Sequence, residues 1–547
     1  MRGKRKPGVK KFFQMILMSW HLFFLNRHCE PKGRGNLFSW DCFVARVRRS
    51  PRNDSLFKLP ILLLAAVVLL SSGFPDKLYA NPEPAPISGT PMLRPQRLQL
   101  LRDYGTSGTI QTEINRGTIF ADVVDQQDSF WTFDFNFPTN DLNGYYQTTA
   151  TCKDVTILST GYYLNIYVQN GQSVSTDVIT TIRNEFINII LPTETAYFGS
   201  PPVGDFTILI LDIQDDYNPA VIGSTYVSGY FDLRNEYSGL SYSNARHMIY
   251  MDSNPGQPGT TTFFGTLAHE FQHFIHFSKD AQEASWVNEG LAGLARFVCG
   301  YGHQSSHVTA FAGLPGTSLT YWEDHLANYG ATYLFMLYLA EHYGGANTTK
   351  NIVANTDQGI DGINSALWQS GYAVTVNDIF KNWVIANYLN NSSVYSGIYG
   401  YTDSFTGVSR APGNIQITNS YSIYPALGSG SVNRYAARYI KFTNLDGIYD
   451  TFVLIPYSLS ESGTQSYSYT GMLGSLILSL TGINNTLGMS GVQQGSSNST
   501  PLVETALSES NTISTSGGVE SSDGGGGCFI ATAAYGSSLA HEVFILR

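Results

Sequence analysis

The stretch TLAHEFQHFI, residues 266–275, decides the fold because it joins a helical pattern to metal-binding side chains. Across Thr261–Phe277 the apolar residues recur at steps of three and four, which predicts an amphipathic helix. His269 and His273 are four positions apart, so both imidazoles leave one helix face with Cβ atoms roughly 6 Å apart. Glu270 lies about a quarter turn away, beside an ion rather than among its ligands. The stretch therefore predicts a metal site with an adjacent carboxylate.

A further ligand is expected, because a hydrolytic zinc site uses three protein ligands and one water. The segment Trp286–Gly290 (WVNEG) offers Glu289, 16 residues beyond His273. That separation lets the chain turn and lay a second helix, expected from Ala284 to Cys299, across the first. The two histidines and Glu289 would then hold one catalytic Zn²⁺. The zinc would acidify its water, and Glu270 would take the proton as general base.

Several segments resemble known peptidases. Two of them resemble the gluzincin branch of the zincin metallopeptidases: Leu267–His273 (LAHEFQH) and Trp286–Ala292 (WVNEGLA). Three upstream segments make the chain most similar to the hyicolysin-like peptidases of bacteria: Leu211–Ile213 (LDI), Gly229–Asp232 (GYFD) and Ile249–Asp252 (IYMD).

The resemblance covers roughly residues 110–345 and implies a two-lobed zinc endopeptidase with the zinc helix at the floor of the cleft. It carries His269, His273 and Glu289 as ligands and Glu270 as catalytic base. Ala292 and Gly293 stand where some relatives have an acidic residue that orients a ligand histidine. That support must therefore come from elsewhere, and Asn288 and a backbone carbonyl are both candidates.

Peptide hydrolysis also needs a hydrogen-bond donor for the developing oxyanion. Tyr329, Tyr333 and His325 lie on or beside a helix expected from Leu326 to Tyr343. Tyr329, next to Gly330, is the chosen candidate, and Tyr333 is expected to pack in the core. His276 is expected to support the site or face the surface, because a fourth protein ligand would exclude water.

An acidic loop follows the buried strand expected at Phe206–Leu211. Oxygen ligands from Asp212, Asp215 and Asp216 could bind Ca²⁺ there. The spacing matches no EF-hand loop, which favours a solvated acidic turn.

Charge is distributed unevenly along the 547 residues. Residues 1–80 hold 15 of the 32 Lys and Arg and 4 of the 42 Asp and Glu, which leaves a net charge of −21 on the rest. The field of such a body repels phosphate, so nucleic acid is excluded as a partner.

Cys152 and Cys299 either form a disulfide or remain buried thiols.

Both ends of the chain carry export or sorting patterns. Lys58 precedes the apolar run Ile61–Leu70, which is shorter than the roughly 20 residues of a spanning helix. Cleavage of this signal is expected after Ala80, which predicts a secreted or cell-surface bacterial protein. Cys528–Ser537 (CFIATAAYGS) resembles the CFI-box tails of exported bacterial proteins. That resemblance implies attachment or processing at the cell envelope through Cys528.

The predicted fold class is α+β, because a helix-rich middle is flanked by segments with strand-like alternation. The expected parts are a basic extension and signal peptide (1–80), a β-rich N-terminal region (81–200), a zincin core with a mixed sheet and a helical lower lobe (201–395), a β-sandwich-like module (396–495), a Ser/Gly-rich linker (496–527) and a sorting tail (528–547).

The leading interpretation is a secreted zinc endopeptidase. Its polypeptide substrate would pair through its backbone with an edge strand near the cleft. Two alternatives are an exported adhesion protein with a non-catalytic zincin fold and a metal-dependent hydrolase of non-peptide amides.

Overall fold

The computed structural model describes residues 84–104, 122–159, 162–221, 223–444, 451–472, 475–480, 486–494, 501–507 and 542–544. The predicted signal segment and its basic extension lie outside these residues, as does Cys528. Asn81–Arg547 form one compact unit.

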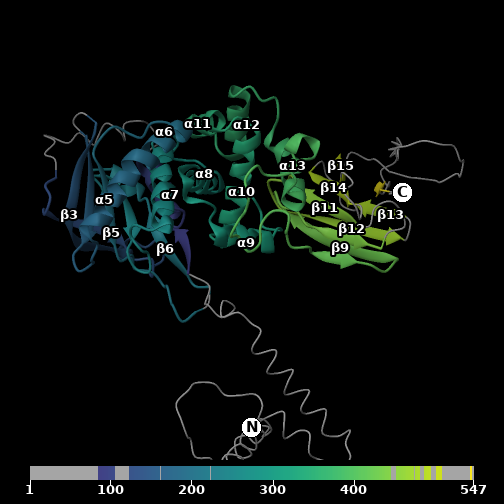
Figure 1. Ribbon diagram of the computed structural model, residues 1–547, viewed down its shortest axis with the longest axis horizontal. Coiled ribbons are helices and arrows are strands. Elements are labelled where there is room, and N and C mark those ends of the chain that lie inside the picture. The colour runs from purple at the N-terminus through teal and green to yellow at the C-terminus, as the bar shows by residue number, and fades with distance from the viewer. Residues whose placement is uncertain are drawn as a thin grey trace, which may run out of the picture. The chain divides into compact units, whose positions relative to one another are not determined.

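A mixed seven-stranded sheet is built from strands in the N-terminal half of the chain, in the order β1-β6-β7-β5-β4-β3-β2 (Figure 1). Its strands are β1 (Ala85–Ser88), β2 (Gln127–Phe133), β3 (Tyr145–Ser159), β4 (Tyr162–Gln169), β5 (Phe206–Leu211), β6 (Thr225–Tyr230) and β7 (His247–Asp252). Strands β4, β5 and β7 are parallel, whereas β6 is antiparallel to β7 and β1 is parallel to β6.

The central strand β5 shows why the sheet is covered on both faces. Its sequence FTILIL is apolar apart from one threonine, and every residue is buried, as expected for a parallel strand between two layers. Ile208 and Ile210 join the core shared with the helices. Leu209 and Leu211 join a second core on the opposite face.

The sheet differs from the expected division of the chain at residue 200. Strands β2, β3 and β4 belong to the same sheet as β5, with Leu164 opposite Phe206 in the parallel pair β4–β5. A parallel pair needs a crossover, and helices α5 (Thr176–Glu185) and α6 (Leu191–Phe198) supply it. The N-terminal strands therefore complete the core sheet.

Helix α7 (Thr261–Phe277) has the predicted bounds, and its first turn is capped by the Thr260 side chain. It packs against β6 and β7, and α8 (Ser285–Arg296) packs between it and α10 (Leu326–His342) (Figure 1). Gly290 permits this close approach, because a Cβ there would lie 2.8 Å from the Thr332 carbonyl oxygen. The remaining helices are α4 (Arg94–Tyr104), α9 (Ser305–Gly313), α11 (Ala346–Ala354), α12 (Gly359–Gln369) and α13 (Val376–Leu389).

Two further sheets follow the helices. One has the order β15-β14-β11-β10-β8 and the other β16-β13-β12-β9. Their strands are β8 (Asn419–Tyr421), β9 (Ala426–Asn433), β10 (Ile440–Thr443), β11 (Thr451–Ser458), β12 (Thr464–Met472), β13 (Ser475–Leu480), β14 (Leu487–Gln494), β15 (Leu502–Leu507) and β16 (Glu542–Phe544). Both sheets contribute to one core that includes Val432, Phe442 and Tyr469, which is the arrangement of a sandwich.

Two strands lie where the sequence analysis expected a linker and a tail. Strand β15, within residues 496–527, pairs with β14; its sequence LVETAL contains the β-branched residues Val503 and Thr505, which favour strands. Strand β16, within residues 528–547, pairs with β13.

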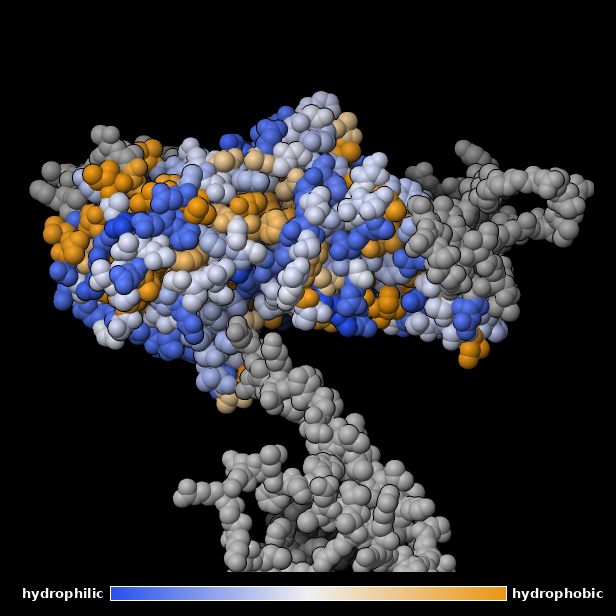
Figure 2. Space-filling model, in the orientation of Figure 1, coloured by the Kyte–Doolittle hydropathy of each residue, from blue (hydrophilic) through white to orange (hydrophobic). Residues whose placement is uncertain are grey.

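Cys152 and Cys299 are both buried free thiols, so the structure contradicts a disulfide between them. Within the described ranges no helix is long and apolar enough to cross a membrane. The face in Figure 2 intersperses polar and apolar residues.

Candidate metal centre

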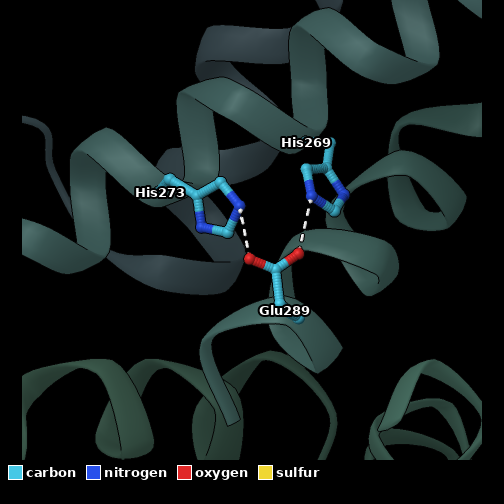
Figure 3. A group of neighbouring side chains, drawn as sticks. All are labelled: His269, His273 and Glu289. Atoms are coloured by element: carbon cyan, nitrogen blue, oxygen red, sulfur yellow. Dashed lines mark hydrogen bonds and ion pairs between the residues drawn. The ribbon is translucent and has the colours of Figure 1, made fainter. Parts of the chain in front are cut away.

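The three predicted ligands converge on one point (Figure 3). Candidate ligand atoms of His269, His273 and Glu289 all lie within 4.8 Å of one another. His269 Nε2 is 3.1 Å from Glu289 Oε2, and His273 Nε2 is 3.2 Å from Glu289 Oε1. The histidines come from one face of α7, and the carboxylate comes from the first turns of α8. The fold thus brings together groups that are 20 residues apart in sequence.

Charge interactions shift the pKa values of Glu289 and His273 in opposite directions. Burial alone would raise the pKa of Glu289, but the charge on His273 and hydrogen bonds from both histidines lower it to about 2. Burial opposes the charge on His273, yet the carboxylates of Glu289 and Glu270 raise the pKa of His273 above its usual value. A buried carboxylate is thus placed against two imidazoles, which satisfies the requirement that a buried charge be paired.

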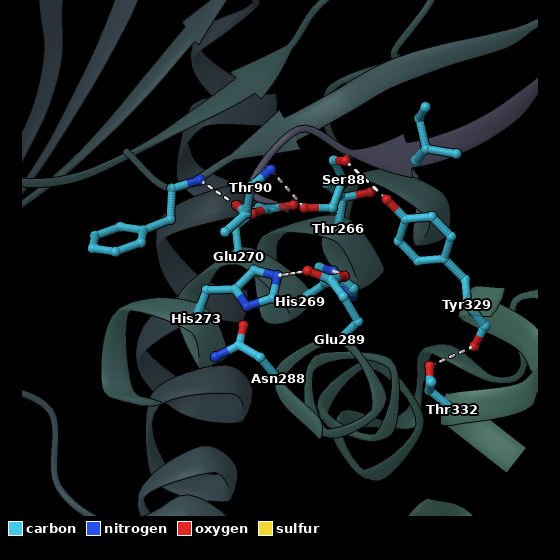
Figure 4. Close-up of polar contacts among 12 residues, drawn as sticks. Ser88, Thr90, Thr266, His269, Glu270, His273, Asn288, Glu289, Tyr329 and Thr332 are labelled. Carbon is cyan, nitrogen blue, oxygen red and sulfur yellow. Dashed lines mark hydrogen bonds and ion pairs between the residues drawn. The ribbon is translucent and has the colours of Figure 1, made fainter. Parts of the chain in front are cut away.

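Glu270 lies beside this cluster and belongs to the same small cavity, of about 30 Å³, as His269 and Glu289. Its side chain is fully buried. One carboxylate oxygen accepts a hydrogen bond of 2.8 Å from the Thr90 hydroxyl, and the other has no partner among the described residues (Figure 4). Gly229 on β6 makes room for it, because a Cβ there would lie 3.1 Å from Glu270 Cγ. A cavity this small holds one or two waters.

Asn288 takes up a supporting position that the sequence left open. Its amide nitrogen is 3.2 Å from His276 Nδ1, and its side chain lies beside His273 (Figure 4). His276 is fully buried and lies outside the three-ligand group. Asn288 can therefore orient His273.

Tyr329 lies at the same cavity as Glu270 and Glu289. Burial raises the pKa of Tyr329 well above its usual value, and the carboxylates of Glu289 and Asp324 raise it further. Its hydroxyl therefore stays protonated, and it donates to the carbonyl oxygen of Ser88 at 3.1 Å.

The other predicted candidates have other partners, although Tyr333 also lines this cavity. The Tyr333 hydroxyl pairs with His303 Nδ1 at 2.6 Å, and His325 caps the first turn of α10. Both oxygens of Asp215 accept backbone amides, from Tyr217 and Val227. Over the described ranges, Asp212, Asp215 and Asp216 are not among the side chains grouped closely enough to hold an ion, and calcium binding at this loop stays a prediction.

Sequence reasoning missed His307 and the segment that contains Ser88 and Thr90. His307 on α9 is buried at the cavity and stacks on Tyr329, with ring centroids 4.9 Å apart. Burial lowers the pKa of His307 to about 3, so the ring is neutral and donates from Nε2 to the Pro86 carbonyl, 3.0 Å away. No motif marks these residues, since Thr90 meets Glu270 across 180 residues and His307 meets Pro86 across 221.

The donor set fits zinc. Two imidazole nitrogens and one carboxylate, with space left beside them, are the ligands and geometry of an open hydrolytic site. Among the described residues, His273 Nε2 contacts Glu289 as an ion pair but forms no hydrogen bond. This nitrogen could therefore bind a metal ion.

Comparisons with known proteins add little. No protein-family model and no curated sequence matches the chain. One similar solved structure is an M1 zinc metallopeptidase from Deinococcus radiodurans, with 12% identity, a TM-score of 0.26 and coverage of 45% of this chain and 58% of that one. A second is a mutant of a two-domain M1 zinc metallopeptidase bound to L-arginine. It has 13% identity and a TM-score of 0.25, and the match covers 47% of this chain and 56% of that one. The chain thus spans less than two thirds of the length of either solved structure, and both likenesses are distant.

Proposed function

We propose that this protein is a zinc-dependent peptidase. The observation that carries the proposal is the convergence of His269, His273 and Glu289 within 4.8 Å at a cavity that Glu270 also lines. A buried cluster of this composition is expensive to form unless it holds an ion or does chemistry.

Zinc bound by these three residues would act as a Lewis acid on water and on the scissile carbonyl. Glu270 takes the proton of the attacking water and returns it to the leaving amine, as a general base and then a general acid. Its partnerless oxygen faces no competing donor among the described residues. Tyr329, protonated and buried, donates a hydrogen bond to the oxygen on which negative charge develops.

A larger cleft of about 620 Å³ adjoins the centre and shares Thr266 and Arg296 with the small cavity. This volume lies in the range of sites that accept a short peptide or a drug-sized ligand. It favours an extended polypeptide over a small amide, which would need only the cavity at the metal.

The first test is metal content. Protein incubated with zinc and desalted should hold one equivalent per chain by mass spectrometry, and His269→Ala should hold none. A wild-type chain without zinc would overturn the proposal.

The second test is chemistry. Glu270→Gln keeps the size of the side chain and the zinc, but it removes the base, so casein cleavage should fall at least 10²-fold. Cleavage at the parental rate would exclude Glu270 as the base. A parallel panel of small amides separates a peptidase from an amide hydrolase.

Export is part of the same proposal. The signal pattern ending near Ala80 and the tail at Cys528 suit a secreted or cell-surface enzyme. N-terminal sequencing of the protein recovered from culture medium tests it, because a chain that starts upstream of residue 60 would contradict cleavage there.

A further inference from the structure

Strand β1 covers the sheet edge that faces the candidate centre. It pairs in parallel with β6, with Ala85 opposite Thr225 and Ser88 opposite Gly229. The Gly89 amide donates to the Gly229 carbonyl at 2.9 Å, and the Ser228 hydroxyl donates to the Ile87 carbonyl at 3.1 Å. All four residues of β1 are buried. Without β1, β6 would be the exposed edge beside α7.

The same short segment contacts Glu270 and Tyr329 beside the candidate ligands (Figure 4). It also contacts His307. The Thr90 hydroxyl donates to Glu270 at 2.8 Å and accepts from the Phe231 amide at 2.8 Å. The Ser88 carbonyl accepts the Tyr329 hydroxyl at 3.1 Å, and the Pro86 carbonyl accepts from His307 at 3.0 Å. These are backbone and hydroxyl contacts of an extended peptide. A bound substrate would use the same donors.

The space left at the centre excludes a second peptide. The cavity beside Glu270 is about 30 Å³, and Pro86, Ile87 and Ser88 form part of its wall. Peptide and ligand sites are roughly ten times larger or more. The adjoining cleft of about 620 Å³ is lined by neither Glu270 nor the three candidate ligands. A polypeptide that lies in this cleft can therefore reach Glu270 only if β1 leaves.

The segment is held along its length by side chains of α4 and by its pairing with β6. On α4, the Gln96 side chain donates to the Thr139 carbonyl at 2.7 Å and accepts from Arg234 at 3.2 Å. Leu93, Leu100 and Leu101 are buried. The pairing with β6 is parallel, which is the less stable register per residue. Residues 105–121, outside the described part, join the segment to β2.

We infer that residues 84–104 are an intramolecular inhibitor that occupies the peptide-binding edge of β6 and keeps the centre closed. The inference rests on the proposed function and deepens it: β6 is the strand with which substrates pair, and this segment takes their place. Thr90 holds the base while the carbonyls of Ser88 and Pro86 hold the two buried donors.

The test is a full chain with a site for a sequence-specific protease inserted in residues 105–121. A tether of this length gives an effective concentration on the order of 1 mM, so a segment with a Kd of about 10 µM leaves roughly 1% of chains open. Nicking followed by dilution to nanomolar concentration should therefore raise hydrolysis of a quenched fluorescent peptide about 100-fold. An equal rate before and after nicking would overturn the inference.

A second measurement reports access without turnover. A fluorescent peptide hydroxamate should bind the zinc-loaded nicked chain and not the intact one. If the probe bound only the nicked chain but neither form hydrolysed peptides, the inference would stand and the proposed function would be wrong. Probe binding to the intact chain, or to neither form, would overturn the inference.

Adding the segment back provides the matched control. A synthetic peptide of residues 84–104 should inhibit the nicked, diluted protein. Its Thr90→Ser version should inhibit comparably, because the hydroxyl remains, and its Thr90→Val version should be at least 10-fold weaker. Equal inhibition by both versions would show that the contact with Glu270 does not hold the segment in place.

Discussion

Replacing Gly290 by alanine should loosen the metal centre through packing alone. Gly290 follows Glu289, the proposed third ligand, on α8. An added Cβ would lie 2.7 Å from Met336 Cγ and 2.8 Å from the Thr332 carbonyl oxygen on α10. Met336 can rotate, but a helix carbonyl cannot. Ordinary contact begins near 3.4 Å, so α8 must move away from α10 by about 0.6 Å.

The magnitude follows from two opposing effects. Overpacking a closely packed helix interface costs about 1–3 kcal/mol, and alanine returns about 1 kcal/mol of helix propensity. We expect a net loss of up to about 2 kcal/mol and a Tm lower by up to roughly 4–8 °C. Metal ligands tolerate about 0.2 Å of displacement, so moving Glu289 should also weaken zinc binding about 10-fold.

The assay is a thermal melt with zinc in excess, together with zinc competition against a chromophoric chelator. Gly313→Ala on α9 is the control, because nothing lies within 4 Å of a Cβ there, and it should melt at or slightly above the parental temperature. If Gly290→Ala matched Gly313→Ala in both Tm and zinc affinity, the reasoning from close helix approach would be refuted.

Three further predictions concern the centre itself. Glu289→Ala should remove the third ligand and lower zinc occupancy by metal analysis, and full occupancy would mean that another residue is the ligand. Tyr329→Phe should lower kcat of the opened enzyme about 10²-fold with little change in KM, whereas Tyr333→Phe, whose hydroxyl pairs with His303, should leave kcat near the parental value; equal effects would reject Tyr329 as the donor. Chelation of zinc should lower Tm by the equivalent of about 3 kcal/mol for a ligand present at 100 times its Kd, and an unchanged melt would indicate that no zinc was bound.

Local patterns predicted the helices of the centre well. Helix α7 has the bounds Thr261–Phe277 expected from its periodicity, because a helix face is encoded within a few residues. The position of Glu289 against both histidines also follows locally, since α7 and α8 are consecutive and pack together. The assignment of a metal and of a reaction to these residues stays a prediction.

Long-range pairing was beyond the sequence pattern. Strand β1 has only four residues and joins a strand that starts 140 positions later, at Thr225. Nothing in the sequence APIS specifies that partner. The buried His307 and the contact from Thr90 to Glu270 depend on the same pairing, so they could not be anticipated. The strands expected in an N-terminal region joined the core sheet for a similar reason, because β4 met β5 through a parallel crossover.

The order of these elements along the chain has a consequence for biosynthesis. Residues 85–90 are made before β6 and α7, and at 5–20 residues per second Glu270 follows Thr90 by roughly 10–40 s. The segment of residues 84–104 is thus synthesised before the side chains of the candidate centre can come together. If this segment followed the centre in the sequence, the centre of a newly folded molecule would stay open until the segment was synthesised. In the present order, the segment is available to complete the sheet and close the centre in the same folding step.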